Sequence, residues 1–259
     1  MRAIWSGAIG FGLVNIPVKI FSATQTSTLD LDMLDKKDNA NIKYKRVNAN
    51  TGKEVAWGNI VKGYNVDGKY VILTDADFEK ASPEKNKMIS IEQFVEEGEI
   101  DGIYFDTPYY LQAEKSGSRA YALLRDALTQ AGKVAVGTFV LRNRESLVLI
   151  KPMEDMLVLN KIRFADEIRD PEEIKTPAVK SKPAEIKMAI QLINQLSTGF
   201  DIAKYKDSYN DKLLKMIKDK AKGKKVTASP LKLVHSRSRD LMSQLKASLG
   251  TGAKRKKAS

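Results

Sequence analysis

Apolar residues near the start of the chain follow a pattern typical of β-strands. Residues 4–23 form an apolar run rich in β-branched and aromatic side chains, interrupted by three glycines and a proline: Gly7, Gly10, Gly12 and Pro17. This pattern predicts strands with a bend. The glycines lack the spacing G-x-G-x-x-G, and Pro17 stands where a dinucleotide-binding fold needs its helix. We therefore assign these glycines a structural role.

Further strands are predicted at residues 69–74, 133–141, 146–151 and 156–164. The last three follow one another with short connections, which favours an antiparallel meander over crossovers through helices. Their nearly continuous apolar character indicates that both faces of the sheet are covered. A barrel or a sandwich fits this arrangement.

Helical periodicity follows in four segments. In residues 118–131 the apolar side chains share one face, with Ser118 as the expected cap and Gly132 as the stop. Three more helices are predicted beyond residue 170, at 184–196, 211–221 and 240–249. The fold class is therefore α+β, with strands in the first 165 residues and mainly helices afterwards.

Positive charge is concentrated at the C-terminus. The chain of 259 residues has a net charge of +12, and 15 of its 44 Lys and Arg residues but only two of its 32 acidic residues follow residue 211. The preceding part, with 29 basic and 30 acidic residues, has a net charge of −1. Such a basic segment suggests a phosphate-backbone partner. The alternative is a solvated tail that only aids solubility.

Residue types exclude much of enzymology. The chain has no Cys and a single His, His235, so disulfides, zinc fingers, Cys nucleophiles and Ser-His-Asp relays are absent. The acidic residues form no converging pattern of the kind a metal-dependent nuclease needs. We predict a protein that is not an enzyme and has neither a cofactor nor a metal. No apolar stretch approaches 18 residues and no signal peptide is visible, so a cytoplasmic protein is expected.

Basic residues that surround Tyr44 are the first candidates for binding phosphates: Lys36, Lys37, Lys43, Lys45 and Arg46. Strand alternation would place Lys43 and Lys45 on one face, where they could follow a nucleic-acid backbone. Alternatively, the lysines protect an exposed edge strand from pairing.

Three further groups of candidates follow. Arg142 and Arg144 occupy a predicted hairpin tip, where they either bracket a phosphate or pair with nearby acids such as Glu145. The last basic cluster comprises Lys254, Arg255, Lys256 and Lys257, which we expect to strengthen non-specific binding. An apolar ridge on the 240–249 helix comprises Leu241, Leu245 and Leu249. This ridge either contacts a protein partner or packs back onto the chain's own core.

Several segments resemble bacterial Ku proteins, in the same order along the chain: IWSGAIGFGLVNIPVKIFSAT at 4–24, LDKKDNANIKYKRVN at 34–48, VKGYNVDGKYVILTDADF at 61–78, EIDGIYFDTPYYLQ at 99–112 and LVLNKIRFADEIRDPEE at 157–173. The resemblance covers residues 2–225, with weaker similarity at 240–249. Many relatives carry His or Cys around Asp32, Asn39 and Asn48, so any metal or redox role of those members is not transferred to this chain.

The resemblance implies a fold and a domain plan. The core, residues 1–225, would comprise an antiparallel β-barrel of the SPOC-like type, an extended bridge insertion and a helical C-terminal arm. Residues 226–259 would form a basic C-terminal segment with a short helix at 240–249 and a flexible tail.

The resemblance also implies a function: a ring-shaped homodimer that binds double-stranded DNA ends without sequence preference and protects and bridges them. Such a protein recruits an ATP-dependent ligase of the ligase D type for non-homologous end joining. It would be nucleoid-associated and have no membrane partner. Two alternatives compete with this function. One is a general nucleic-acid binder that ignores ends, and the other is a magnesium-dependent nuclease.

Overall fold

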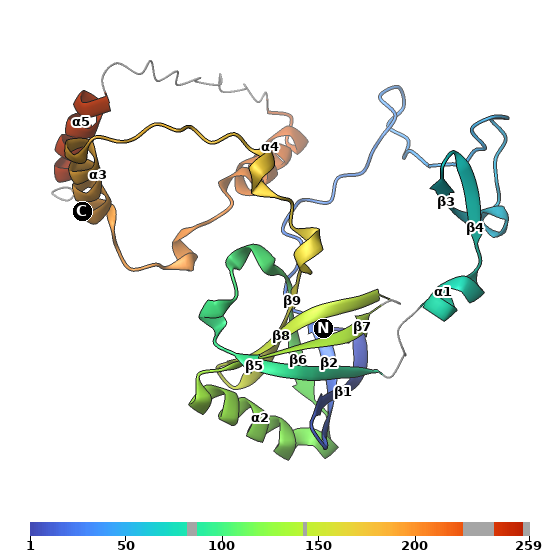
Figure 1. Ribbon diagram of the computed structural model, residues 1–259. Helices are drawn as coiled ribbons and strands as arrows, with labels where there is room; N and C mark the ends of the chain where they lie inside the picture. Colours follow the sequence, from blue (N-terminus) through green and yellow to red (C-terminus); the bar gives the residue numbers. More distant parts are fainter. Residues whose placement is uncertain (82–86, 142–143, 225–240, 256–259) are drawn as a thin grey trace. The chain divides into compact units, whose positions relative to one another are not determined.

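The computed structural model describes residues 1–81, 87–141, 144–224 and 241–255 (Figure 1). The chain divides into two compact units. The first comprises residues 1–26 and 31–170, and the second comprises residues 27–30 and 171–259.

Seven strands of the first unit close into a barrel: β1 (Trp5–Phe11), β2 (Val14–Ser22), β5 (Met88–Val95), β6 (Phe105–Ala113), β7 (Val134–Leu141), β8 (Arg144–Met153) and β9 (Met156–Ile162). Their order around the barrel is β1-β2-β6-β9-β8-β7-β5. The predicted meander is confirmed, because β7, β8 and β9 are consecutive antiparallel neighbours.

One pairing in the barrel is parallel, which corrects the prediction of a wholly antiparallel barrel. Strands β1 and β5 run in the same direction, with Ala8 opposite Met88 and Gly10 opposite Ser90. A parallel pair needs a long connection, and the chain supplies one between the end of β2 and the start of β5. The sequence pattern identified the strands but not which of them meet where the barrel closes.

Close backbone contact explains a glycine of the N-terminal run. A Cβ atom at Gly7 would lie 2.1 Å from the carbonyl oxygen of Lys87, just before β5 begins. The neighbouring amide of Ala8 donates a hydrogen bond of 2.9 Å to that same oxygen. Only glycine, which has no Cβ atom, lets these two backbone segments approach this closely. The structural role predicted for this residue is confirmed.

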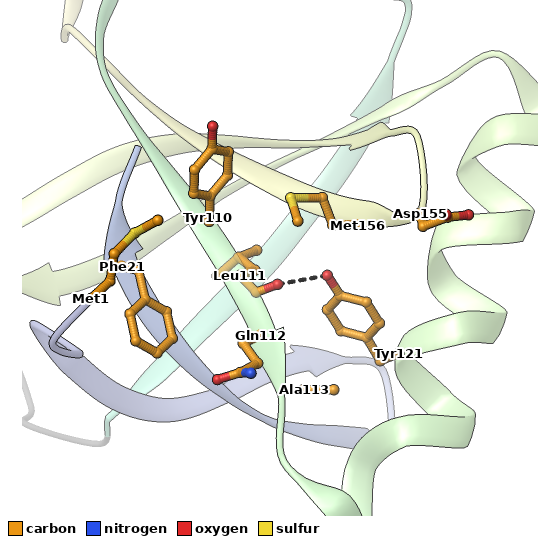
Figure 2. A pocket seen from close by; sticks show the side chains of 9 residues that line it. All are labelled: Met1, Phe21, Tyr110, Leu111, Gln112, Ala113, Tyr121, Asp155 and Met156. Carbon is orange, nitrogen blue, oxygen red and sulfur yellow. Dashed lines mark hydrogen bonds between the residues drawn. The ribbon is translucent and has the colours of Figure 1, made fainter. Parts of the chain in front are cut away.

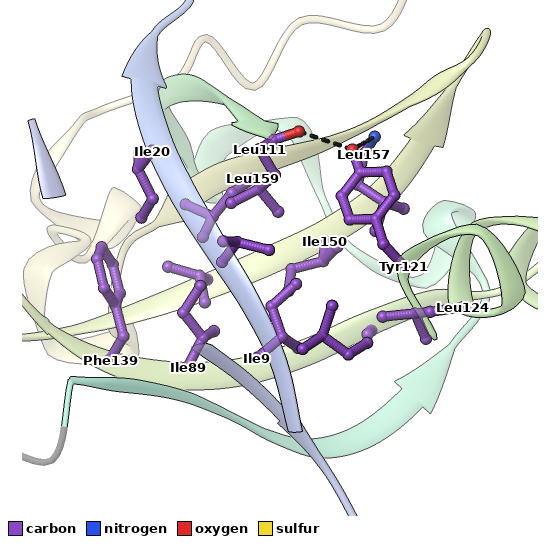
Figure 3. Packing of buried hydrophobic residues seen from close by; sticks show 14 of the residues in the cluster. Ile9, Ile20, Ile89, Leu111, Tyr121, Leu124, Phe139, Ile150, Leu157 and Leu159 are labelled. Carbon is purple, nitrogen blue, oxygen red and sulfur yellow. Dashed lines mark hydrogen bonds between the residues drawn. The ribbon is translucent and has the colours of Figure 1, made fainter. Parts of the chain in front are cut away.

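The barrel interior and helix α2 (Ser118–Ala131) share one hydrophobic core (Figure 3). Buried side chains from the strands include Ile9, Ile150 and Leu159, and α2 adds Tyr121 and Leu124. Each fully buried aliphatic side chain of this size contributes about 1.5–3 kcal/mol. The periodicity predicted the buried face of α2 only in part, because Leu124 and Leu128 are buried but Leu123 is 66% exposed.

The ends of α2 match the prediction at one terminus only. Gly132 has a left-handed φ of 62° and its amide donates to the carbonyls of Leu128 and Thr129, so it ends the helix as predicted. Ser118 does not cap the start. Its backbone is already helical, and its hydroxyl donates to the carbonyls of Glu114 and Lys115, because a 3-10 turn directly precedes the helix.

A second cluster covers part of the barrel's outer face. Val134, Val136, Leu149 and Ile162 are buried there, and Tyr104 packs against them. Short 3-10 turns at Glu97–Glu99 and Gly102–Tyr104 bring this covering segment across the strands. The prediction that these strands are covered on both faces is confirmed.

Residues 31–81, which we call the bridge, lie between β2 and β5. They contain the 3-10 turn η1 (Trp57–Asn59), strands β3 (Lys62–Val66) and β4 (Lys69–Leu73), and helix α1 (Asp75–Ala81). Strands β3 and β4 form an isolated two-stranded sheet. Asp67 and Gly68 connect them with φ of 48° and 85°, the positive values that a type I′ hairpin turn requires.

The second unit is helical. It contains α3 (Pro183–Leu196), α4 (Ser208–Ala221) and α5 (Leu241–Arg255), with short 3-10 turns at Pro171–Glu173 and Ile202–Lys204. The three predicted helices are therefore present. Helix α5 continues to Arg255, so the flexible tail predicted after residue 249 does not begin there.

Tyr121 ties α2 to two barrel strands. Its hydroxyl donates a hydrogen bond of 2.6 Å to the carbonyl of Leu111 and accepts one of 2.6 Å from the amide of Leu157. These two residues are opposite each other in the pairing of β6 with β9. The side chain is only 8% exposed, so water cannot easily replace either hydrogen bond.

Replacing Tyr121 by Phe is expected to lower the free energy of unfolding by about 1–3 kcal/mol, because a buried carbonyl and a buried amide lose their partner. Urea denaturation followed by circular dichroism measures this loss. The matched control is Tyr64→Phe, which removes a hydroxyl from a side chain of β3 that is 69% exposed. If both variants unfold at the same urea concentration as the unaltered chain, the bridging hydroxyl does not stabilise the barrel.

The same hydroxyl predicts a loss of stability in alkali. Burial raises the pKa of Tyr121 above its ordinary value of 10.0, although the Leu157 amide and the positive charge of Arg125 oppose the shift. The folded state therefore holds this proton more tightly than the unfolded state. This contribution to stability is fully present below pH 10 and is lost as the pH rises through the folded-state pKa.

We expect the free energy of unfolding to fall more steeply above about pH 10 for the unaltered chain than for Tyr121→Phe. Urea denaturation at a series of pH values measures the two slopes. Parallel pH curves would show that ionisation of this phenol is not linked to folding.

Candidate nucleic-acid interface

Two tight turns shape the basic part of the bridge. In the first, the amide of Ile42 donates to the carbonyl of Met33, and the side chains of Asp35 and Asp38 accept from amides two residues further on. Its two arms form one isolated antiparallel β-type pair, between Leu34 and Asn41. These side-chain hydrogen bonds favour a turn over a strand.

The second turn follows directly. The amide of Val55 donates to the carbonyl of Arg46, and the Asn48 side chain accepts from the amides of Asn50 and Thr51. Residues 42–46 therefore lie between two turns and outside any strand. The predicted strand alternation of Lys43 and Lys45 is wrong, and these lysines do not protect an edge strand.

The five predicted basic residues of the bridge fall into two groups. Lys45 pairs with Glu54 at 2.8 Å, and the guanidinium of Arg46 lies 4.3 Å from the centre of the Trp57 ring. The other group comprises Lys36, Lys37 and Lys43, which are exposed. Within the described part of the chain, these three lysines make no ion pair. They are therefore available to an external anion.

Basic side chains of the barrel and α2 are mostly engaged. Ion pairs hold six of them: Lys19, Arg125, Lys133, Lys151, Lys161 and Arg163. Arg163, for example, lies 3.5 Å from Asp106 and also donates to the carbonyl of Phe105. In contrast, residues 36–66 contain seven basic and two acidic side chains. This part of the bridge therefore carries positive charge that its own acids do not offset, although the whole bridge has nine basic and eight acidic residues.

The other predicted basic residues are placed only in part. Arg144 is the first residue of β8 and is exposed, whereas Arg142 lies outside the described residues. Lys254 and Arg255 end helix α5, although their side chains are not described, and Lys256 and Lys257 lie outside the described residues. Their role in binding stays a prediction.

The three leucines of α5 differ in exposure. Helix α5 packs against α3, and the side-chain Nε2 of Gln195 donates a hydrogen bond of 3.5 Å to the carbonyl of Leu249. Leu245 and Leu249 are partly buried, whereas Leu241 is 56% exposed. The partly buried pair favours packing within the chain, against α3. Leu241 stays accessible to a partner.

An open hollow of about 590 Å³ lies on the barrel beside β6 and α2 (Figure 2). Apolar side chains such as Phe21 and Met156 line it, and Asp155 is its charged residue. A hollow with an acidic side chain and no basic one is unsuited to phosphate. The exposed lysines of the bridge are therefore better candidates for contacting a nucleic-acid backbone than this hollow.

Two other kinds of site are absent from the described ranges. No group of three or more His, Asp or Glu side chains there could hold a metal ion. No helix there is long and apolar enough to cross a membrane.

The sequence also matches a family of known proteins. The family model described as "Ku70/Ku80 beta-barrel domain" matches residues 10–188, more than half of the chain. The chain belongs to the Ku family. The matched range includes the whole bridge and all barrel strands except residues 5–9 of β1, and it ends within α3. The predicted resemblance and the predicted Ku barrel are confirmed.

Three Ku proteins show how far the similarity extends, each named "Non-homologous end joining protein Ku". The protein of Cupriavidus necator is 43% identical over 226 residues, which cover 85% of this chain and 67% of the relative. That of Pseudomonas aeruginosa is 41% identical, covering 85% of this chain and 77% of the relative. That of Opitutus terrae is 38% identical, covering 100% of this chain and 96% of the relative.

Sequence reasoning missed two features of this Ku bridge. Lys53 is exposed beside the second turn and makes no ion pair with the described residues, and Trp57 lies against Arg46. The lysine could have been found from the turn residues Asn48 and Gly52, which bring it back toward Arg46. The stacked pair has no signal in the sequence, because its two members are 11 residues apart with a turn between them.

Replacing Lys36, Lys37 and Lys43 together by Gln is expected to weaken binding of duplex DNA. Each lysine that neutralises a phosphate adds about 0.9 to the slope of log affinity against log salt, so the variant should have a slope lower by up to about 3. Fluorescence anisotropy at several salt concentrations measures the slope.

The matched control replaces three ion-paired lysines of the barrel by Gln: Lys19, Lys133 and Lys151. It changes the net charge by the same amount but removes lysines that already have acidic partners. Equal slopes for the two triple variants would contradict a bridge-centred interface.

Proposed function

We propose that this protein binds the ends of double-stranded DNA without regard to sequence, as a ring-shaped homodimer, in the repair of breaks by non-homologous end joining. Membership of the Ku family carries this proposal, since 41–43% identical relatives have names that state this process. Unpaired lysines on the bridge support a phosphate-backbone partner. Because DNA is that partner, we propose that the protein is associated with the nucleoid in the cytoplasm.

A ring recognises a break by topology. A closed loop of protein passes over a DNA terminus and cannot enter the middle of an intact duplex, so no contact with base edges is needed. The contacts of such a ring are numerous, individually weak and sensitive to salt. The bridge is the segment best suited to line it, because it is a long excursion from the barrel that carries exposed lysines.

Exposed apolar side chains support a second copy as the partner that closes the ring. Helix α3 exposes four of them: Ile186, Ile190, Ile193 and Leu196. The β3–β4 hairpin exposes Tyr64, Tyr70, Val71 and Ile72. An isolated two-stranded hairpin is at best marginally stable in water, and apolar surface of this extent is unusual on a monomer. Homodimerisation would cover these faces.

We also propose that the protein binds DNA ends without catalysing a reaction on them. Two observations support this part of the proposal. The described residues include no group of side chains that could hold a metal ion, and the chain has no Cys and one His. A magnesium-dependent nuclease is the competing enzymatic function. A purified preparation that cleaved DNA when magnesium was added would favour that function instead.

Threading predicts a difference between DNA substrates of one sequence. The protein should bind an open linear duplex strongly, and bind a covalently closed circle or a linear duplex with bulky blocked ends weakly. Electrophoretic mobility shift at two salt concentrations measures the three affinities. A general basic binder would bind line and circle equally, and that result would refute the proposed ring.

We also propose that α5 helps to recruit an ATP-dependent ligase of the ligase D type. Leu241 supports this part, because it is 56% exposed while the other two leucines of its ridge are partly covered. An exposed leucine on an amphipathic helix is a common anchor for a protein groove.

Replacing Leu241 by Asp should reduce ligase capture in a pull-down at least tenfold, while binding of DNA ends stays unchanged. The control is Leu13→Asp, which introduces the same charge at a fully exposed leucine of the β1–β2 turn. Unchanged capture by the Leu241 variant would exclude this residue from the ligase contact.

A further inference from the structure

We propose that Trp57, with Arg46 against its ring, forms a stacking site for an unpaired nucleobase on the bridge. The inference deepens the proposed function and rests on it: the protein would bind a DNA end and, beside it, a base of a single-stranded overhang. Arg46 places its guanidinium carbon 4.3 Å from the centre of the Trp57 ring. The Trp57 residue is 72% exposed, so much of the indole stays open to solvent.

Backbone hydrogen bonds hold the two side chains together. The amide of Val55 donates to the carbonyl of Arg46 at 2.8 Å, which brings the two arms of the second turn side by side. Two residues after Val55, the 3-10 turn η1 begins at Trp57 and closes with the amide of Ile60 donating to the Trp57 carbonyl. The ring is therefore presented from a defined turn and not from an extended strand.

The exposure of the indole is what needs explanation. Tryptophan is highly buried on average, since its large apolar surface is unfavourable in water. The guanidinium offsets part of this cost by lying against the ring, but it is itself a cation that binds nucleic acid. The remaining surface is flat, aromatic and electron-rich. A flat partner with its own π system fits such a surface best.

The surroundings point to a nucleic-acid base and not to another flat molecule. Lys43 and Lys53 belong to the same segment, are exposed and make no ion pair with any described residue. Stacking platforms among basic side chains are the usual means of binding single strands, because every base has a π face and the backbone is anionic. Tyr44, which is 78% exposed and follows Lys43 in the sequence, adds a second aromatic ring to this segment.

The site selects unpaired bases for a geometric reason. Bases inside a duplex stack on one another, so their faces are not accessible to a protein side chain. An overhang at a DNA end leaves the faces of its bases free. The site would therefore distinguish an end with an overhang from a blunt end, without reading the sequence of either.

The test compares three DNA ends that share one duplex: a blunt end, an end with a 3′ overhang of thymidines, and the same overhang built from abasic nucleotides. Stacking predicts that base-bearing overhangs bind at least about fivefold more tightly than abasic ones. Trp57→Ala should abolish this preference, and Trp57→Phe should keep most of it. The control Tyr209→Ala removes a ring of similar exposure, at 69%, from helix α4 and should also keep it.

The blunt end separates this inference from the proposed function. If the unaltered protein binds blunt linear duplex no better than circular DNA, the proposed function fails, whatever Trp57 does. If blunt ends bind well but base-bearing and abasic overhangs bind alike, the stacking site is refuted and end binding stands. If Trp57→Ala weakens binding of all three ends equally, the indole serves assembly or folding, and the inference is again wrong.

Fluorescence gives a second measurement that does not depend on affinity. The chain has two tryptophans, and the emission lost in Trp57→Phe is that of Trp57. Stacking predicts that this emission is quenched by the thymidine overhang and not by the abasic overhang. Equal quenching by the two overhangs would show that a base does not lie against the ring.

Discussion

Pairing between β1 and β5 closes the barrel, and the position of the bridge depends on it. The two strands run parallel, so the chain must leave the barrel after β2 and travel a long way before it returns beside β1. Glycine at position 7 permits the close approach of the returning chain. The insertion is therefore held at both ends by one closed sheet, whose interior α2 helps to fill.

Charge is distributed differently over the frame and the insertion. Lysines and arginines of the barrel and α2 largely lie beside acids, so their fields are offset at short range. In the bridge, Lys45 has an acidic partner, but Lys36, Lys37 and Lys43 make no ion pair with the residues that the structure describes. A nearly neutral first part of the chain can thus still present positive charge where the segment is exposed. Net charge does not show this local excess, because residues 1–211 sum to −1 and the positive net charge comes from the C-terminal lysines and arginines.

Much of the fold was predictable from the sequence because its signals are local. Alternating and continuous apolar runs predicted the meander, and the 3.6-residue period with Gly132 as stop predicted α2. The parallel closure was not predictable, since no local pattern says which strands meet after a long insertion. Lys43 and Lys45 were misplaced because side chains of Asp35, Asp38 and Asn48 bond to the backbone and form turns.

The candidate site was predictable only in part. Residue type identified the bridge lysines, but an ion pair such as Lys45 with Glu54, and the contact of Arg46 with Trp57, depend on how two turns bring distant positions together. The leucines of α5 illustrate the same limit. Their spacing predicted a ridge, whereas the neighbour that covers part of it, α3, is determined by tertiary packing.

The β3–β4 hairpin has two strand edges that are open to further pairing. Its two strands pair only with each other among the described residues, which leaves backbone donors and acceptors on their outer sides ready to bind any extended chain. Such a surface favours misassembly and aggregation while the polypeptide is alone. Lys62 and Lys69, one on each strand, supply like charges that discourage it. A partner strand that paired with either edge would remove these exposed donors and acceptors from solvent.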